Sequence, residues 1–466
     1  MENNTSERLA PRVRLERLFD NGAFEEVNIK SDEGIGRGVI CAYGKVQGRL
    51  TFAYSQDYTV KGGSLGQGEA DKIEDIQKRA LAVHAPVVAL LESGGARIQE
   101  GSLALDGYGR IFHMNILSSG RLPQIAVVFG ACAGGAAYSP ALMDFIITVN
   151  ERARMFITGP DVVKAVTGES VTAQELGGAQ TLARTSGISH FTAADDEDAL
   201  NYARSILSYL PGTTTGETAD RSGQIASLVP TTPKRSYDMR GLIALVADEG
   251  SVLEYMKDWG RNAVTAFARI NGQAVAMVGN QPLVKAGCID VDASDKMARF
   301  IRTADNMGLP IVTFVDTPGY MPGTHEEHSG IIRHGAKLLY AYTEAGVPKV
   351  TIIVRKAFGG AYIAMGSKSL GADGLFAYSF SQIAVMGAEG AMSIIARKEL
   401  AAASNPQERL KELSAEYEEK FMHPSFSLNA GLIDRIITPE ETRKCILDTL
   451  SKAADRSHKV HGNIPL

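Results

Sequence analysis

Residues 86–97 read PVVALLESGGAR, and residues 310–321 read PIVTFVDTPGYM. Each stretch is a run of apolar residues that ends in small residues, which is typical of a buried strand followed by a tight turn. A second pair of segments follows, with LPQIAVVFGACAGGA at 122–136 and VPKVTIIVRKAFGGA at 347–361. The first pair is offset by 224 residues (310 minus 86) and the second by 225 (347 minus 122). The chain therefore contains an internal repeat.

The repeat predicts the fold. Any two α/β segments can look alike, but Gly-Gly-Ala recurs at the same distance from a strand-to-turn marker, which favours a duplicated domain. Each copy is expected to run strand, strand, glycine turn, helix, strand, glycine turn, helix, strand, Gly-Gly-Ala and helix. This alternation predicts an α/β fold with a largely parallel sheet that is covered by helices.

Length also predicts two domains, because 466 residues exceed what one hydrophobic core of about 250–300 residues supports. Residues 211–236 hold the linker-like segments PGTTTG and VPTTP, so we predict domains at residues 1–225 and 226–466. Ala402–Lys420 is expected to be a charged helical stretch. Thr438-Pro439-Glu440-Glu441 has the form of a helix N-cap with Pro at N1 and Glu at N3.

Composition excludes several classes of function. The formal net charge is −5, which offers no general attraction to nucleic acid. Four scattered cysteines argue against a disulfide framework or a cysteine-rich zinc site, and indicate a reducing compartment. The polar start, Met1–Asn4, lacks a signal-peptide core, so a cytoplasmic location is expected. The uncharged run Ile125–Met143 contains turn-forming glycines and is interpreted as buried core, not a membrane span.

The two Gly-Gly-Ala turns are candidate oxyanion holes. A glycine turn that enters a helix exposes backbone N–H groups that have no intrahelical acceptor, and the helix dipole adds positive potential there. Such donors stabilise a developing oxyanion by roughly 3 kcal/mol each. A tight turn with glycine for packing is the structural alternative. Two such turns at equivalent places in a repeat favour function, so Gly134-Gly135-Ala136 and Gly359-Gly360-Ala361 are the candidates.

The turn Ser93-Gly94-Gly95-Ala96-Arg97 is a second candidate element. It follows the predicted strand Val87–Leu91, and ligands of open α/β sheets bind at the carboxyl ends of strands. Arg97 could contact a phosphate. An ion pair of Arg97 with Glu100 or Glu92 is an equally good interpretation.

Motifs for other chemistries are missing from the sequence. No Walker-type loop occurs. Ser93 and Ser139 have no histidine close by in the sequence. His325-Glu326-Glu327-His328 has the wrong spacing for a zinc motif and is expected to be a polar loop, so no metal is predicted. Gly34–Gly38 leads into a strand-like run, Val39–Tyr43, where a dinucleotide fingerprint needs a helix. Backbone oxyanion holes without acid–base side chains suit enolate chemistry in which a substrate supplies the base.

Several long motifs resemble the carboxyltransferase (beta) subunits of biotin-dependent acyl-CoA carboxylases, of the propionyl-CoA carboxylase and methylmalonyl-CoA decarboxylase type. They extend over nearly the whole chain in family order, and include FAYSQDYTVKGGS (52–64), ESGGARIQEG (92–101), GACAGGAAYSPAL (130–142), MFITGPDVV (155–163), DTPGYMPGTHEEHSGIIRHGAKLLYAY (316–342), RKAFGGAYIAMGSKSLGAD (355–373) and IAVMGAEGA (383–391).

The resemblance implies two tandem crotonase (ClpP)-like domains, commonly in a homohexamer. The N-terminal domain would bind acyl-CoA, and the C-terminal domain would bind carboxybiotin. The chain lacks an Ala-Met-Lys-Met biotinylation site, so the implied partners are a biotin carboxylase and a separate biotin carboxyl carrier subunit.

The same resemblance assigns roles to residues. The catalytic amides would be those of Gly134 and Gly135 for the thioester enolate, and those of Gly360 and Ala361 for the ureido oxygen of biotin. Substrate-binding residues would be Ser93, Gly94, Gly95, Ala96, Arg97, Ala136 and Ile363. The apolar Ile363 matches a family residue that faces the acyl group, and it favours propionyl-CoA over acetyl-CoA, with methylmalonyl-CoA as product.

The sequence leaves alternatives open. Tyr378-Ser379 stands where the family usually has Trp-Pro, in a wall expected near the C-terminal site. The enzyme could also work in reverse as a methylmalonyl-CoA decarboxylase or transcarboxylase subunit. A third alternative is a catalytically reduced scaffold subunit, which the intact glycine pairs argue against.

Overall fold

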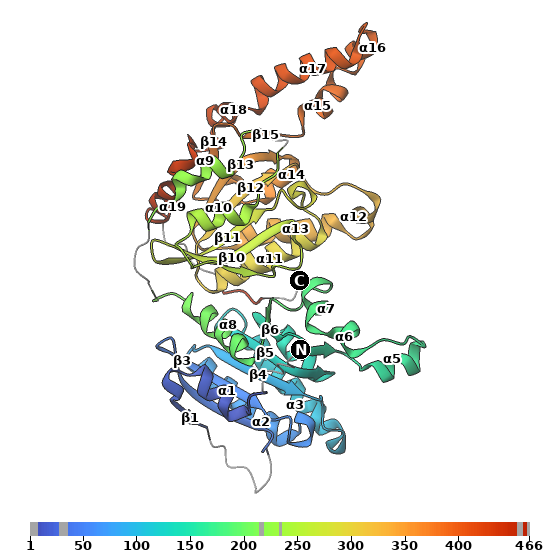
Figure 1. Cartoon of the computed structure of the whole chain (residues 1–466), viewed down its shortest axis with the longest axis vertical. Helices are drawn as coiled ribbons and strands as arrows, with labels where there is room; N and C mark the ends of the chain where they lie inside the picture. The colour runs from blue at the N-terminus through green and yellow to red at the C-terminus, as the bar shows by residue number, and fades with distance from the viewer. Residues whose placement is uncertain (1–7, 28–35, 214–218, 233–234, 454–459, 464–466) are drawn as a thin grey trace, which may run out of the picture. The chain divides into compact units, whose positions relative to one another are not determined.

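The computed structural model describes residues 8–27, 36–213, 219–232, 235–453 and 460–463. These residues form two compact units (Figure 1). Unit 1 holds the described residues up to Leu210 together with 460–463, and unit 2 holds those from Pro211 to 453. The domain bounds 1–225 and 226–466 stay a prediction. Part of the linker predicted at 211–236, and Gly34-Ile35 of the glycine run, lie outside the described residues.

Unit 1 is built on a mixed sheet in the order β1-β2-β3-β4-β5-β6-β8, with β7 paired to β5. The first three strands pair antiparallel and the others parallel. The strands are β1 (Phe24–Glu26), β2 (Val39–Val46), β3 (Arg49–Gln56), β4 (Val87–Ser93), β5 (Gln124–Ala133), β6 (Phe145–Val149), β7 (Arg154–Phe156) and β8 (Phe191–Ala193). The helices are α1 (Pro11–Leu18), η1 (Asp20–Gly22), η2 (Lys61–Gly63), α2 (Gln67–Ala82), η3 (Ile98–Glu100), α3 (Ser102–Ser118), α4 (Gly135–Ala141), α5 (Pro160–Thr167), α6 (Ala173–Gly177), α7 (Ala179–Arg184) and α8 (Asp196–Ser208).

Unit 2 repeats this topology in the order β9-β10-β11-β12-β13-β14-β16, with β15 paired to β13. The strands are β9 (Leu253–Tyr255), β10 (Ala263–Ile270), β11 (Gln273–Asn280), β12 (Ile311–Thr317), β13 (Lys349–Phe358), β14 (Gly374–Tyr378), β15 (Gln382–Ala384) and β16 (Arg435–Ile437). The helices are η4 (Ser222–Gln224), α9 (Ile225–Leu228), α10 (Met239–Val246), η5 (Lys285–Gly287), α11 (Val291–Asn306), α12 (Thr324–His328), α13 (Ile331–Glu344), α14 (Gly359–Ala364), η6 (Lys368–Leu370), α15 (Ala388–Ile395), α16 (Arg397–Ala402), α17 (Pro406–Tyr417), η7 (Glu418–Met422), α18 (Pro424–Asn429), η8 (Pro439–Glu441) and α19 (Thr442–Leu450).

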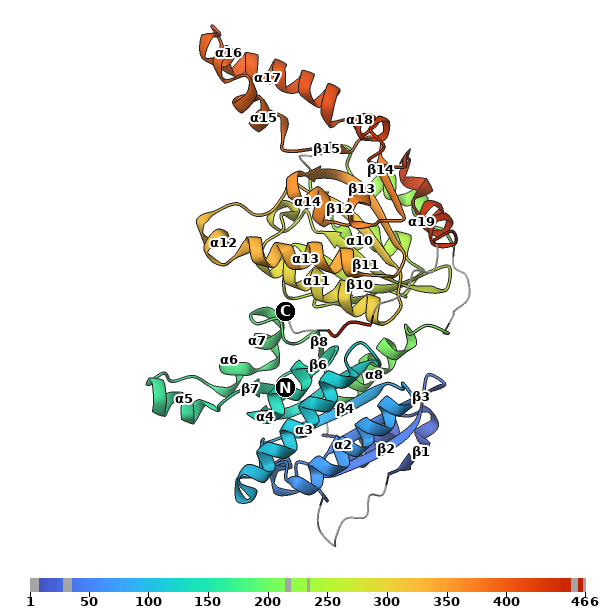
Figure 2. The same cartoon turned by 180° about the vertical axis from the view of Figure 1, so that it is seen from behind.

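Helices cover both faces of each sheet. Strand β4 is buried along its whole length, as its unbroken apolar run predicts. Its residues Val87, Ala89 and Leu91 join the core under α2 and α3, while α1 and α8 contact each other and other strands of the sheet. In unit 2, α11 and α13 pack together, and α10 and α19 form a core with alternate residues of β13 (Figure 2). The duplicated α/β fold predicted from the repeat is confirmed.

Local predictions fare unevenly. Ile125–Met143 is strand β5 followed by α4, as expected for buried core, and Thr438 caps its helix by a capping box with Glu441. The predicted helix at 402–420 is shorter, because α17 begins at Pro406 after an Asn405 cap. The polar loop predicted at His325–His328 is wrong, since these residues lie in the short helix α12. No helix in the described part of the chain is long and apolar enough to cross a bilayer.

A lysine, half-buried in unit 1 and fully buried in unit 2, binds the same loop in both units. In unit 1, Lys72 donates to the carbonyls of Gly36 (3.1 Å) and Val39 (2.7 Å). In unit 2, Lys296 stands 224 residues later (296 minus 72) and donates to the carbonyls of Trp259 (3.0 Å), Gly260 (3.4 Å) and Ala263 (2.8 Å). Lys296 is fully buried, and this burial lowers its pKa to about 7. Lys72 thus joins α2, and Lys296 joins α11, to the chain segment that leads into β2 or β10.

Lys296 predicts a pH-dependent stability. Its pKa is near 10.4 in an unfolded chain and about 7 when folded, so between these values the unfolded state binds a proton that the folded state lacks. The Lys296 contribution to the free energy of unfolding should therefore rise with pH across this window, by up to about 1.4 kcal/mol per pH unit. We expect Lys296→Met to lose this slope, measured as urea midpoints between pH 7 and pH 9.

Lys72→Met is the matched control, because it removes the equivalent carbonyl contacts of unit 1 but leaves Lys296 in place. It should keep the slope of the unsubstituted protein. Equal slopes for that protein and Lys296→Met would contradict the assignment.

Candidate functional site

The first half-site lies where β5 turns into α4. Gly134 has φ 58°, a left-handed conformation that favours glycine, and α4 begins at the next residue. The N–H of Gly134 donates to the carbonyl of Phe156 on β7 at 3.1 Å. The N–H groups of Gly135 and Ala136 stand in the first turn, where a helix supplies no acceptor. Of the predicted pair, Gly135 thus offers a donor while the Gly134 amide is already engaged, and Ala136 is the second donor.

The second half-site has the same geometry at the start of α14. Gly359 has φ 58°, and Gly360 and Ala361 follow it in the first turn. These two residues stand 225 positions after Gly135 and Ala136 (360 minus 135), so the predicted pair of unit 2 matches the pair that the structure leaves available in unit 1.

An aromatic ring explains the glycine that follows the left-handed residue in unit 1, but not the one in unit 2. A Cβ on Gly135 would lie 2.8 Å from Cδ2 of Tyr108, so glycine is required there by the ring of a helix α3 side chain. A Cβ on Gly360 would lie 3.8 Å from Tyr320, an ordinary contact. Sequence analysis missed both tyrosines. Tyr320 stood within a quoted motif, whereas only the packing of α3 against α4 brings Tyr108 to Gly135.

The turn at residues 93–97 lies directly beside the first half-site. Ser93 at the end of β4 pairs in register with Cys132 of β5, and a Cβ on Gly95 would lie 2.7 Å from the carbonyl oxygen of Ala133. This close approach accounts for glycine at position 95, where φ is 98°. Parallel pairing therefore brings two of the predicted site elements together.

Most backbone donors of this turn are already used. The Gly94 N–H donates to the carbonyl of Gly62 (2.9 Å), and the Arg97 N–H donates to the carbonyl of Leu65 (2.8 Å). The Gly95 N–H donates to Oγ of Ser93 (3.2 Å), whose hydroxyl donates to the carbonyl of Gly63 (2.7 Å). The turn is thus a rigid wall, and ligand binding by Ser93, Gly94, Gly95, Ala96 and Arg97 stays a prediction.

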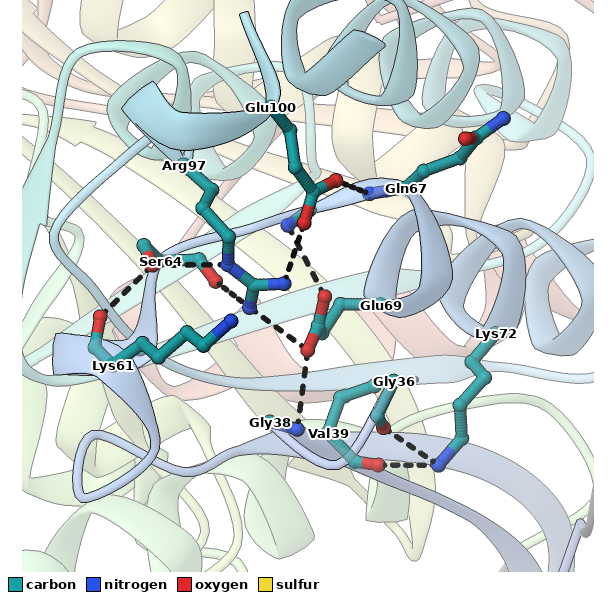
Figure 3. A network of polar contacts seen from close by, with 12 residues as sticks. Gly36, Gly38, Val39, Lys61, Ser64, Gln67, Glu69, Lys72, Arg97 and Glu100 are labelled. Carbon is teal, nitrogen blue, oxygen red and sulfur yellow. Dashed lines mark hydrogen bonds and ion pairs between the residues drawn. The ribbon is translucent and has the colours of Figure 1, made fainter. Parts of the chain in front are cut away.

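Arg97 is held in a network of side chains and carbonyls (Figure 3). Its guanidinium contacts Glu69 (2.9 Å) and Glu100 (2.8 Å) and donates to the carbonyl of Ser64 (2.8 Å). Only 6% of Arg97 is exposed. The ion-pair alternative with Glu100 is therefore observed, whereas Glu92 pairs elsewhere. Arg97 joins the turn at 93–97 to the one at 61–67, which leaves its guanidinium engaged within the protein and not turned to a phosphate.

A buried acid supports the strand end in each unit. Glu92 accepts from Arg14 (2.8 Å) in unit 1, and Asp316 accepts from Arg355 (2.7 Å) in unit 2. The backbone N–H of each acid donates to an amide side chain of the neighbouring strand, from Glu92 to Gln56 (3.0 Å) and from Asp316 to Asn280 (3.1 Å). Removing one partner of such a buried pair costs about 3–5 kcal/mol, so the turns that follow rest on a fixed base.

In the part of the chain that the structure describes, the hydroxyl groups near the amides are not arranged as general bases. The Ser139 hydroxyl donates to Asn115 (2.9 Å), and Oγ of Ser93 lies 3.3 Å from the Tyr108 hydroxyl. Burial raises the pKa of Tyr108 well above its ordinary value and that of Tyr320 to about 12, so both phenols keep their protons near neutral pH.

Two further predicted residues are placed by the structure. Ile363 on α14 is 44% exposed, and its counterpart on α4, Tyr138, is 48% exposed. Contact of Ile363 with an acyl group stays a prediction. The location of the 378–382 segment near the C-terminal site stays a prediction; within it, the Tyr378 side chain is fully buried in the core, with its hydroxyl 2.7 Å from that of Thr442 on α19.

Comparison with known proteins gives a consistent family. The carboxyl transferase domain matches residues 2–464. The chain is 45% identical to the methylmalonyl-CoA decarboxylase subunit alpha of Propionigenium modestum, over 99% of this chain and 94% of that protein. It is 46% identical to the propionyl-CoA carboxylase carboxyltransferase subunit of Haloferax mediterranei, over 98% of this chain and 94% of that one.

A solved structure of the transcarboxylase 12S subunit, with methylmalonyl-coenzyme A and methylmalonic acid bound, has the same fold. Its TM-score is 0.92 at 44% identity, over 98% of this chain and 92% of the other. The predicted fold and the predicted family are both confirmed. The chain belongs to the carboxyl transferase domain family and is a carboxyltransferase.

Proposed function

We propose that this carboxyltransferase moves a carboxyl group between carboxybiotin on a carrier protein and the α-carbon of a short acyl-CoA. Propionyl-CoA is the favoured acceptor and methylmalonyl-CoA the product. The observation that carries the proposal is the duplicated helix start, which presents Gly135 and Ala136 in unit 1, and Gly360 and Ala361 in unit 2. The relatives named for propionyl-CoA and methylmalonyl-CoA enzymes support this substrate class.

The residues present fit both substrates. In unit 1, the two first-turn amides hold the thioester oxygen as it gains negative charge, and each donor stabilises that charge by roughly 3 kcal/mol. In unit 2, the equivalent amides hold the ureido oxygen. When bound, carboxybiotin supplies the carboxyl group and the acceptor for the α-proton. The raised pKa values of Tyr108 and Tyr320 agree with this arrangement, since neither phenol can act as a base near neutral pH.

Exposed apolar side chains support an assembly of several copies. They cluster in the segments that follow β7 and β15, at Ile157, Val162, Val166, Val385, Met386, Ile394 and Ile395. Clusters of exposed apolar side chains mark protein interfaces. The 12S relative is described as a hexamer, and we propose a homohexamer here too. Biotin carboxylase and carrier subunits would be its partners, and the cytoplasm its compartment.

The direction of transfer is the second question, because the relatives include both a decarboxylase and a carboxylase. Exposed, aliphatic Ile363 fits a methyl-bearing acyl group in either direction. The catalytically reduced scaffold is the weaker candidate, since both amide pairs are intact.

The proposal predicts biotin-dependent decarboxylation by the purified protein. Incubation with methylmalonyl-CoA and free biotin should yield propionyl-CoA, which mass spectrometry detects. Methylmalonyl-CoA should react faster than malonyl-CoA. Ile363→Asp should reverse this preference, because a carboxylate disfavours the methyl group. Product formation without biotin, or no product despite measurable thioester binding, would contradict the proposal.

The amide donor of Ala136 can be tested directly. Proline lacks the N–H and is tolerated in the first turn of a helix, so Ala136→Pro should keep α4 and remove one donor. We expect kcat to fall about 100-fold, with a smaller change in KM. Ala136→Ser keeps the amide and is the matched control. Equal kcat for the two variants would exclude the Ala136 amide from the oxyanion hole.

A further inference from the structure

The two half-sites differ in the turn beside the amides, where unit 1 has Ala96 and unit 2 has Tyr320. Ala96 in unit 1 and Tyr320 in unit 2 are equivalent by backbone hydrogen bonding and not merely by numbering. In unit 1, the Leu65 N–H donates to the carbonyl of Gly95 (2.9 Å), and the Arg97 N–H donates to the carbonyl of Leu65 (2.8 Å). In unit 2, the Ile289 N–H donates to the carbonyl of Gly319 (3.0 Å), and the Met321 N–H donates to the carbonyl of Ile289 (2.8 Å). The bridges Leu65–Ala96 and Ile289–Tyr320 therefore superimpose the two turns.

The Tyr320 ring spans from α13 to the start of α14. A Cβ on Gly335 would lie 2.9 Å from Cε1, so glycine at this position of α13 makes room for the ring. The Tyr320 hydroxyl is 3.4 Å from the Gly335 carbonyl. The opposite edge, Cδ2 and Cε2, would lie 3.8 Å from a Cβ on Gly360. Tyr320 is partly exposed, and its ring lies beside Gly360.

Unit 1 supports its glycine in another way. The ring beside Gly135 is that of Tyr108, which comes from α3, is buried, and turns its hydroxyl to Ser93. The position equivalent to Tyr320 carries only the methyl group of Ala96. The helix position equivalent to Gly335 is Tyr108 itself, because Arg110 and Lys337, each two residues further on, pair with the equivalent acids Asp71 and Asp295. Unit 1 therefore has a ring at the helix position where unit 2 has the glycine that makes room for Tyr320.

We infer that Tyr320 is a specificity-determining residue, whose ring directs a flat cyclic urea to the Gly360 and Ala361 amides, while Ala96 leaves the unit 1 amides open to a thioester chain. This inference rests on the proposed function for the identity of the two ligands. Aromatic side chains pack well against flat rings, and a small side chain leaves room for a flexible chain beside the amides. One duplicated fold thereby acquires two different half-sites.

Binding measurements test the inference separately from turnover. Equilibrium dialysis with labelled free biotin, and calorimetry with propionyl-CoA, would be run on the full chain in its native assembly. Tyr320→Ala should weaken biotin binding at least about tenfold and leave propionyl-CoA binding within about twofold. Ala96→Tyr should weaken propionyl-CoA binding at least about tenfold and leave biotin binding within about twofold. Tyr320→Phe keeps the ring and should bind biotin like the unsubstituted protein.

The inference would be overturned by unchanged biotin binding in Tyr320→Ala, by an equal loss for both ligands, or by a loss in Tyr320→Phe as large as in Tyr320→Ala. Tyr320→Leu keeps apolar bulk without a flat ring, so biotin binding at the original strength in this variant would also overturn it. Circular dichroism melting and the oligomeric state identify variants that fail to fold. Failure of decarboxylation with the expected binding pattern intact would overturn the proposed function alone.

Discussion

The fold depends on one constraint: a buried parallel strand must turn at once into a helix whose first amides have no acceptor. A left-handed glycine makes this turn in both units, at Gly134 and Gly359, because an L side chain rarely adopts a φ of 58°. The turn directs the next two N–H groups away from the sheet. These amides cannot be satisfied by the helix, so they remain available to an anionic oxygen. The core, the ion pairs and the loop fastenings all serve to hold this geometry.

Duplication preserved the framework and changed its supports. Strand order, register and the paired lysines Lys72 and Lys296 are shared by the units. The cation under the strand end comes from α1 in unit 1 and from β13 in unit 2, as Arg14 and Arg355. Backbone geometry thus sets the chemistry common to both half-sites, and side chains around it are free to distinguish the ligands.

Sequence predicts the parts of this structure that depend on neighbouring residues. The runs at 87–91 and 311–315 specify buried strands, and Gly-Gly-Ala specifies the turn into a helix, because strand burial and turn chemistry are local signals. The offset of the repeat adds long-range information, since equal spacing implies equal topology. Fold class and the two glycine turns into helices follow from these two signals, but the shift of the available unit 1 amides from Gly134 and Gly135 to Gly135 and Ala136 does not.

Other features depend on partners distant in sequence. Phe156, which engages the Gly134 amide, arrives on β7 through strand pairing. The sequence offers Glu92 and Glu100 as partners for Arg97, and the structure shows Glu100 together with Glu69. Glu69 comes from α2, so its contact with Arg97 depends on how α2 packs. The Tyr378 side chain lies on the α19 side of its sheet. The sequence of β14 does not predict this face, because five residues are too few for a clear alternation of apolar and polar side chains.

The central claim is that the first-turn amides of α4 hold the reacting oxygen of a CoA thioester. A crystal structure of the protein with a non-hydrolysable propionyl-CoA analogue tests it most directly. We expect the carbonyl oxygen at hydrogen-bond distance, about 3 Å, from the nitrogens of both Gly135 and Ala136, with the Gly134 amide still bonded to the carbonyl of Phe156. A carbonyl oxygen bound to the Gly134 amide, or at the Gly360 and Ala361 amides of unit 2, would contradict it.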